Sequence, residues 1–210
     1  SLSVEEGQFV SIIGSNGTGK TTLVNLIRQP ERYTFDGKIR LAGVGRIGYV
    51  SQFAIREGDQ SISVYDYLYQ DFLALEQAMG DVCAEMAETE DMDAVMERYQ
   101  ALLDESDAVD ADNYEVNIRK QLKLAELEGK ETLELEKLSG GELKLVQVIR
   151  QMLRRPGILI MDEPDVFLDF ENLNGLRDLI NAYKGTLLVV THSRYLLAHC
   201  FDKIWHLENG

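Results

Sequence analysis

The most constraining feature of this sequence is a glycine-rich octapeptide, Gly14-Ser15-Asn16-Gly17-Thr18-Gly19-Lys20-Thr21, which matches the pattern G-x4-G-K-[ST]. An apolar run over residues 9–13 predicts a strand before it, and apolar periodicity predicts a helix over residues 20–28 after it. Glycines let successive backbone N–H groups curl around phosphate oxygens, and the helix N-terminus adds partial positive charge. Lys20 supplies an ammonium for phosphates and Thr21 a hydroxyl for Mg²⁺. A chance glycine-rich turn is disfavoured because the strand and the helix flank the loop.

Two adjacent carboxylates end a second apolar run. Residues 158–161 predict a buried strand, and Asp162 and Glu163 follow it directly. Such a pair is costly at a strand end unless a cation lies there, and this edge of an open α/β sheet is where ligands bind. We expect Asp162 to hold Mg²⁺, directly or through water, and Glu163 to orient or deprotonate an attacking water. Acidic capping of the next helix is the alternative, which the phosphate loop makes less favourable.

Three weaker signals are ambiguous when each is taken alone. Leu138-Ser139-Gly140-Gly141-Glu142 precedes a helix predicted over residues 141–154; it fits a capping box, but its N–H groups also fit an anion site. Gln52 follows a strand predicted over residues 46–50 and is either a solvated strand end or a ligand to Mg²⁺ or water. His192 follows a strand predicted over residues 186–190 and is either a polar cap or a donor to a γ-phosphate.

Apolar runs and helical periodicity alternate along most of the chain. Besides the elements above, the pattern predicts strands over residues 38–41 and 203–207 and helices over residues 64–79, 114–127, 172–183 and 194–199. Continuous Val, Ile and Leu runs bounded by helices indicate parallel strands that are covered on both faces. The fold class predicted from these patterns is therefore α/β.

The net charge of −15 is concentrated in one segment. Residues 71–116 hold 15 acidic residues and one basic residue, a net charge of −14, whereas the rest of the chain has a net charge of −1. Val95, Tyr99 and Leu102 recur at helical spacing, so we expect this segment to be helical. A solvated helical hairpin explains it most simply, and a docking face for a basic protein partner is the alternative. Direct contact with RNA is disfavoured by charge repulsion.

Composition excludes several other classes of protein. Hydrophobic residues make up 45% and charged residues 27% of the chain, as in globular domains and unlike disordered chains. No apolar run approaches the roughly 18–20 residues of a membrane helix, so no direct membrane insertion is expected. Cys83 and Cys200 show neither a zinc pattern nor a disulfide framework, which favours the cytoplasm. The abrupt start, without Met, leads us to expect a fragment of a longer chain.

Taken in order, Gly14–Thr21, Gln52, Leu138–Glu142, Ile158–Pro164, Asp169 and His192 resemble the Walker A, Q-loop, signature, Walker B, D-loop and H-loop motifs of the ATP-binding domain of the ABC superfamily. The resemblance implies a P-loop NTPase core of mostly parallel strands with flanking helices, an antiparallel β subdomain and a helical subdomain. It implies one ABC domain over residues 1–210, with the ATP-binding core in 1–63 and 157–210. The helical subdomain is then 64–156, and it includes an acidic arm over 71–116.

The resemblance also implies an ATPase whose site needs a second ABC domain, because ATP is sandwiched between Walker A of one domain and the signature of another. Glu163, His192 and Gln52 are then catalytic, and Thr21, Gln52 and Asp162 hold Mg²⁺. The aromatic residue that stacks on adenine in this family is expected upstream of Ser1. The residues expected to bind ATP are Gly14, Ser15, Asn16, Gly17, Thr18, Gly19, Lys20, Thr21, Thr22, Ser139, Gly140, Gly141 and Asp169.

Three features resemble the F branch of the superfamily, whose tandem ATPases act on ribosomes. Glu142 ends the signature where transporter domains usually have Gln, and residues 183–197 are similar to the pattern Y-x-G-T-[LV]-[LI]-x-V-[ST]-H-[DN]-R-Y-F-L. The 85 residues between Gln52 and Leu138 are long for a transporter domain and suit an inserted helical arm. Two departures from the F-branch pattern are the sequence D-V-F-L-D at residues 165–169, in place of T-N-H-L-D, and Ser193 in place of an acidic residue.

These features predict a factor in translation or antibiotic resistance that acts through ATP-dependent domain closure. Its partners are then a second ABC domain and, through the acidic arm, the ribosome or a basic ribosomal protein. Two alternatives stay open. One is the ATP-binding subunit of an ABC membrane transporter, and the other is a nucleotide-binding clamp with little turnover.

Overall fold

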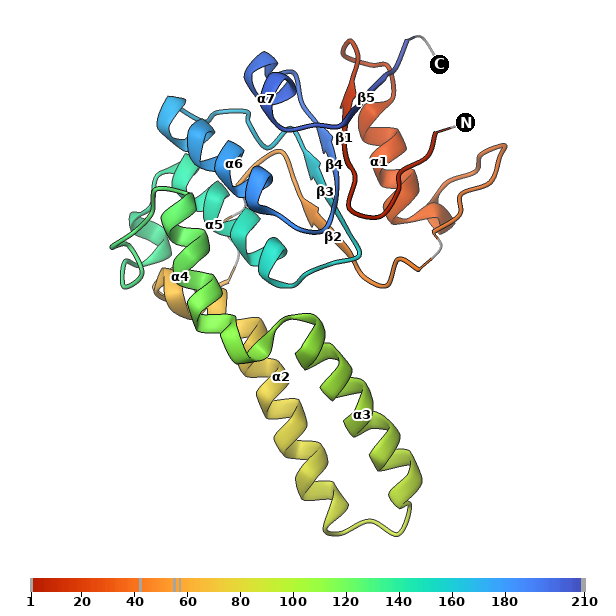
Figure 1. The fold of residues 1–210 in the computed structure, drawn as a ribbon, viewed down its shortest axis with the longest axis vertical. Coiled ribbons are helices and arrows are strands. Elements are labelled where there is room, and N and C mark those ends of the chain that lie inside the picture. The colour runs from red at the N-terminus through yellow and green to blue at the C-terminus, as the bar shows by residue number, and fades with distance from the viewer. Residues whose placement is uncertain (1, 42, 55, 57, 209–210) are drawn as a thin grey trace.

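Within residues 2–41, 43–54, 56 and 58–208, which the computed structural model describes, five strands form one parallel sheet (Figure 1). They pair in the order β2-β3-β4-β1-β5. Val190 lies beside Ile12 on one side and beside Asp162 on the other, so the strands end at a common edge. The segments that follow β1 to β4 therefore emerge close together. The strands are β1 Phe9–Ile13, β2 Ile47–Val50, β3 Ile158–Asp162, β4 Thr186–Val190 and β5 Lys203–His206.

Helices cover both faces of the sheet because successive strand side chains point to opposite faces. On one face Ile160 and Val190 pack with Val24 of α1, and on the other Met161 and Val189 belong to the core formed by α5 and α6. The helices are α1 Lys20–Arg28, α2 Val64–Met86, α3 Met92–Ala108, α4 Tyr114–Leu124, α5 Gly140–Leu153, α6 Phe170–Ala182 and α7 Arg194–His199, with 3-10 turns at Pro30–Arg32, Ala111–Asn113 and Leu135–Lys137.

The arm is a helical hairpin of α2 and α3 that projects away from the sheet (Figure 1). Side-chain caps begin both helices: the Ser63 hydroxyl accepts from the Asp66 N–H, and Asp91 accepts from the Ala94 N–H. Along the hairpin few residues are buried, chiefly Val82 and Val95 where the two helices face each other. The segment predicted to be helical is therefore helical, and most of its carboxylates lie in solvent.

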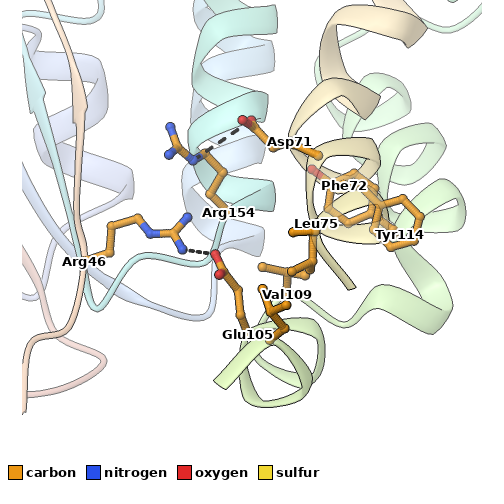
Figure 2. Close-up of a pocket in the computed structure, with 11 residues that line it drawn as sticks. Arg46, Asp71, Phe72, Leu75, Glu105, Val109, Tyr114 and Arg154 are labelled. Atoms are coloured by element: carbon orange, nitrogen blue, oxygen red, sulfur yellow. Dashed lines mark hydrogen bonds and ion pairs between the residues drawn. The ribbon is translucent and has the colours of Figure 1, made fainter. Parts of the chain in front are cut away.

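The base of the arm is joined to the core by ion pairs (Figure 2). Arg150 near the end of α5 forms two hydrogen bonds with Asp71 of α2, from Nε to Oδ2 at 2.8 Å and from Nη2 to Oδ1 at 3.1 Å. Arg154 lies 4.0 Å from the same carboxylate, and Arg46 before β2 pairs with Glu105 of α3. The side chains of Arg46, Asp71, Glu105 and Arg154 line a cavity of about 240 Å³ between the arm and the core.

Two predicted elements differ from the structure. Residues 38–41 are irregular, and no described strand pairs with them, so the antiparallel β subdomain that the resemblance implied is not formed within the described residues. Leu41 is exposed, and an isolated extended segment gains no ladder hydrogen bonds. The helix predicted over residues 64–79 continues to Met86 because Val82 extends its buried stripe.

The helix predicted over residues 114–127 ends at Leu124. Glu126 adopts the left-handed conformation, and the Leu127 N–H donates to the Leu122 carbonyl at 2.8 Å, which is a Schellman-type stop. Among the described residues, each helix is too short or too polar to cross a bilayer.

Candidate nucleotide-binding site

The glycine-rich loop closes tightly between β1 and α1. Gly14 (φ +156°) leaves no room for a side chain, since a Cβ there would lie 2.6 Å from the Leu207 carbonyl oxygen and 2.7 Å from the Thr18 hydroxyl. Gly19 caps α1 in the left-handed conformation at φ +89°. Because Gly19 has no side chain, it leaves the first N–H groups of α1 without a side-chain cap. The loop therefore presents uncapped backbone donors, the usual basis of an anion site at a helix N-terminus.

Lys20 lies inside this loop. Its side chain is buried, and its Nζ donates to the carbonyls of Gly14 at 2.8 Å and Ser15 at 3.0 Å. The Thr18 hydroxyl donates to the same Ser15 carbonyl at 2.9 Å. The loop is thus wrapped around a buried ammonium, which gives it a positive centre at the edge of the sheet.

Asp162 and Glu163 lie next to this loop, at the end of β3. Asp162 is buried, and burial, followed by the charge of Glu163, raises the pKa of its carboxyl, although the hydroxyl of Thr21 donates to it. A carboxylate and a hydroxyl are hard oxygen ligands of the kind that Mg²⁺ prefers. These residues therefore fit a Mg²⁺ ion, which would relieve the repulsion between the two carboxylates.

Gln52 and His192 meet at the Glu163 carboxylate. Gln52 Nε2 donates to Glu163 Oε2 at 3.0 Å, and His192 Nε2 lies 3.8 Å from Glu163 Oε1. Glu163 has a positive φ of +47°, and its N–H donates to the Val190 carbonyl at 2.8 Å, which turns its side chain out at the strand end. The parallel order of β2, β3 and β4 brings these three residues together from distant parts of the chain.

The Ser139–Gly141 segment begins α5. Its capping box is formed: Ser139 Oγ accepts from the Glu142 N–H at 3.2 Å, and Glu142 Oε2 accepts from the Ser139 N–H at 2.9 Å. Lys130 pairs with Glu142. Burial alone would raise the pKa of Glu142, but the hydrogen bonds from Lys130 and Ser139 outweigh burial and lower that pKa. The structural explanation of this pentapeptide is thus correct, and it leaves the Gly140 and Gly141 N–H groups at the start of the helix.

The structure does not bring the Ser139–Gly141 segment to the phosphate loop of the same chain. The helices α1 and α5 pack on opposite faces of the sheet, and no hydrogen bond or ion pair among the described residues joins 139–141 to 14–22. Asp169 is on the α5 side, where its Oδ1 caps α6 by accepting from the Asn172 N–H at 2.9 Å. A cavity of about 380 Å³ lies between this segment, Gln52 and Asp169.

Sequence reasoning missed two buried polar side chains, those of Lys144 and Thr191. Lys144 of α5 donates to the Ser51 carbonyl, and the Thr191 hydroxyl donates to Asp165 Oδ1 at 2.6 Å. Burial lowers the pKa of Lys144 to about 8, against the opposing charges of Asp162 and Asp165. The available signal was a lysine inside the run Leu143 to Val146, which is buried throughout. The adenine-stacking residue expected upstream of Ser1 lies outside the described residues.

Comparisons with known proteins agree with this geometry. Residues 1–166 match the family described as ABC transporter. The chain is 27% identical to the uncharacterized ABC transporter ATP-binding protein YfmM of Bacillus subtilis, over 97% of this chain and 40% of that protein. It is 28% identical to the energy-dependent translational throttle protein EttA of Haemophilus influenzae, over 100% of this chain and 38% of that protein. The chain thus spans about two fifths of the length of these relatives.

Solved structures share the fold. A dimeric post-hydrolysis state of the ATP-binding cassette MJ0796, bound to ADP and Pi, has a TM-score of 0.61 at 22% identity and covers 100% of this chain and 84% of that one. An inward-facing putative metal-chelate type ABC transporter has a TM-score of 0.62 at 21% identity and covers 98% of this chain and 70% of that one. The family match covers most of the sequence and includes the phosphate loop, the Ser139–Gly141 segment and the carboxylate pair. The chain therefore belongs to the ABC transporter family, as a P-loop ATPase domain.

Proposed function

We propose that this chain is a Mg²⁺-dependent ATPase domain of an F-branch ABC protein that acts on the ribosome in the cytoplasm. The cluster of Gln52, Glu163 and His192 carries the catalytic part of the proposal. A carboxylate that receives a hydrogen bond at 3.0 Å on one oxygen, with an imidazole 3.8 Å from the other, is held in a fixed orientation at the sheet edge. Orienting one water toward a phosphorus atom needs such a fixed base.

Each residue has a role in this scheme. The Lys20 ammonium and the N–H groups at the start of α1 bind the β- and γ-phosphates. Asp162, Thr21 and Gln52 hold Mg²⁺, which when bound neutralises charge on the phosphates. Glu163 orients the attacking water and accepts its proton, and His192 donates a hydrogen bond to the γ-phosphate.

A second ABC domain completes the site. Since the segment Ser139–Gly141 starts on the opposite sheet face from α1, its N–H groups are free to meet ATP bound by another domain. The dimeric form of the MJ0796 cassette supports this arrangement. Asp169 lines the same cavity as the Ser139–Gly141 segment and contributes to the contact with the second domain. Binding of ATP then closes the two domains, and hydrolysis lets them separate.

The F-branch role rests on the relatives and on the arm. EttA proteins, which are named translational throttles, match over the full length of this chain. The tip of the arm carries seven exposed carboxylates against Arg98, which pairs with Glu85, so it suits a basic ribosomal protein better than RNA. The seven are Asp81, Glu85, Glu88, Glu90, Asp91, Asp93 and Glu97.

The catalytic part is tested by Glu163→Gln in the full-length protein that contains the second ABC domain. We expect ATP turnover to fall by about 10²-fold or more, since a positioned general base contributes about that factor. ATP-dependent association of the domains should grow, because the closed state is no longer released. Unchanged turnover would exclude Glu163 as the catalytic carboxylate and leave a clamp with little turnover as the better description.

The ribosomal part is tested by sedimentation of the Glu163→Gln protein with ribosomes in the presence of ATP. We expect co-sedimentation, and weaker co-sedimentation when the tip carboxylates are changed to Gln or Asn. The same protein without ATP is the control for closure. A membrane permease encoded beside the gene, together with no ribosome binding, would favour the transporter alternative.

A further inference from the structure

Lys144 is a lysine buried in the core of this domain. Its side chain is 2% exposed, on α5 between Leu143 and Leu145, which are also buried. A buried lysine ordinarily sits beside a carboxylate, because an unpaired ammonium is costly to desolvate. No carboxylate of the described residues forms an ion pair with Lys144, and its ammonium instead donates to the backbone carbonyl of Ser51. The cost of its burial therefore needs an explanation other than a simple salt bridge.

The Ser51 carbonyl lies immediately before Gln52. The hydroxyl of Ser51 donates to the Phe53 carbonyl at 2.9 Å, so the backbone on both sides of Gln52 is fixed. Gln52 in turn donates to Glu163 at 3.0 Å. A short chain of contacts thus leads from the Lys144 ammonium through Ser51 and Gln52 to Glu163.

Hydrogen bonds that do not involve Lys144 fix the backbone beside His192. The buried Thr191 hydroxyl donates to Asp165 Oδ1 at 2.6 Å. The same Thr191 Oγ1 accepts from the Ser193 N–H at 3.0 Å. These bonds fix the backbone on both sides of His192, as the Ser51 contacts do for Gln52.

We propose that Lys144 is a positioning residue for ATP hydrolysis: it holds Gln52 against Glu163 through the Ser51 carbonyl. It does not touch the phosphates. The inference rests on the proposed ATPase function and deepens it. Because Ser139 caps α5, which begins at Gly140 and carries Lys144 in its second turn, a displacement of the Ser139–Gly141 segment by a partner domain is carried by a rigid helix to Gln52.

The test uses the full-length protein with Lys144→Met, which keeps the length and apolar stem of the side chain and removes its charge. We expect kcat to fall about tenfold, the effect of losing one hydrogen bond from a charged group, while KM for ATP stays within about twofold. Lys144→Arg should restore part of kcat, because it returns a cation to the same place. Lys123→Met on α4, an exposed lysine, is the matched control and should leave kcat unchanged.

A double-mutant cycle separates positioning from mere support of the fold. If Lys144 acts through Gln52, Lys144→Met should cost little further kcat in a Gln52→Ala background, whereas independent effects would multiply. Thermal unfolding of each variant shows whether it is folded. Should Lys144→Met fail to fold, Lys144→Gln replaces it in the same cycle with Gln52→Ala.

Three results would overturn the inference: unchanged kcat in the folded Lys144 variants, a loss of kcat that multiplies in full with Gln52→Ala, or a rise in KM that accounts for the whole effect. The proposed ATPase function fails in a different way, by the absence of turnover in the unaltered protein or its insensitivity to Glu163→Gln. The two outcomes are therefore distinguishable.

Discussion

The edge of the sheet contains a buried aspartate, Asp162, and the base of the arm contains a partly buried one, Asp71; their surroundings shift the two pKa values in opposite directions. At the sheet edge, burial and then the charge of Glu163 raise the pKa of Asp162. At the arm base, burial alone would raise the pKa of Asp71, but the hydrogen bonds and charge of Arg150 outweigh burial and lower it. The pKa of Arg150 is raised, first by its hydrogen bonds to Asp71.

We propose that the difference separates a structural charge, Asp71, from a functional one, Asp162. Asp71 is fully compensated by side chains of the chain itself, through the paired hydrogen bonds from Arg150, which are the strong form of such contacts. Asp162 is compensated only in part, by Thr21 and by the more distant charges of Lys144 and Lys20. A carboxylate left in repulsion with its neighbour stores free energy that a bound cation recovers. Removal of the Asp162 charge should therefore lower turnover and spare stability, whereas removal of the Asp71 charge should lower stability and spare turnover.

The largest effect is expected from Asp162→Asn. In the full-length protein we expect ATP turnover to fall by about 10²-fold or more, because the proposed charged ligand for Mg²⁺ is lost. Stability without nucleotide should be unchanged or higher, because the repulsion with Glu163 is removed. Steady-state turnover over a Mg²⁺ titration and urea unfolding measure the two quantities. A marked loss of stability would mean that Asp162 is as structural as Asp71.

The reverse pattern is expected from Asp71→Ala at the arm base. It leaves Arg150 without its main partner, and we expect the free energy of unfolding to fall by about 2 kcal/mol, the range for hydrogen bonds between charged groups. Turnover should stay within about twofold. Asp112→Ala, an exposed acidic residue beyond α3, is the matched control and should change neither quantity. Turnover that falls with stability intact would show that the arm base influences catalysis.

The sequence predicted those parts of the fold that depend on the local order of apolar and polar residues. The five strands of the sheet and the helix after the phosphate loop followed from apolar runs, glycines and periodicity. Gln52 and His192 were each ambiguous alone, and they became a cluster with Glu163 only through the parallel strand order. The residues 38–41 had a strand-like composition, but a strand also needs a partner, which local pattern does not reveal.

The sequence also could not distinguish the acidic residues that pair with the core from those that lie in solvent. Asp71 and Asp81 are both aspartates of α2 in the same acidic segment. Asp71 nevertheless pairs with Arg150 of the core, whereas Asp81 is exposed to solvent. That distinction depends on where α2 crosses the end of α5, which is a long-range contact. Lys144 was missed for the same reason, because its partner, the Ser51 carbonyl, is 93 residues away along the chain.

The shifted pKa of Asp71 also predicts a pH dependence of stability. Its folded-state pKa lies below its unfolded value, so its contribution is present above about pH 4 and is lost as the pH falls through the folded-state pKa. Asp71→Asn should therefore lower stability at neutral pH and lose less further stability on acidification than the unaltered protein. Urea unfolding at a series of pH values measures this. Parallel curves for the two proteins would show that the pKa of Asp71 is not depressed.

The smallest effect is expected from Arg46→Gln. Arg46 pairs with Glu105, but both side chains are about two fifths exposed, at 41% and 42%, so solvent screens the pair. Exposed pairs of this kind contribute about 0–1 kcal/mol, and we expect a loss of about 0.5 kcal/mol or less in the free energy of unfolding. Glu105→Gln should give the same small loss, and the double variant no more than either alone. A loss as large as that of Asp71→Ala would mean that the arm is anchored through α3 as firmly as through α2. The exposed Arg46–Glu105 pair would then stabilise the arm as much as the half-buried Arg150–Asp71 pair. The contrast between Asp71 and Asp162 would in that case account for only one of the two attachments of the arm.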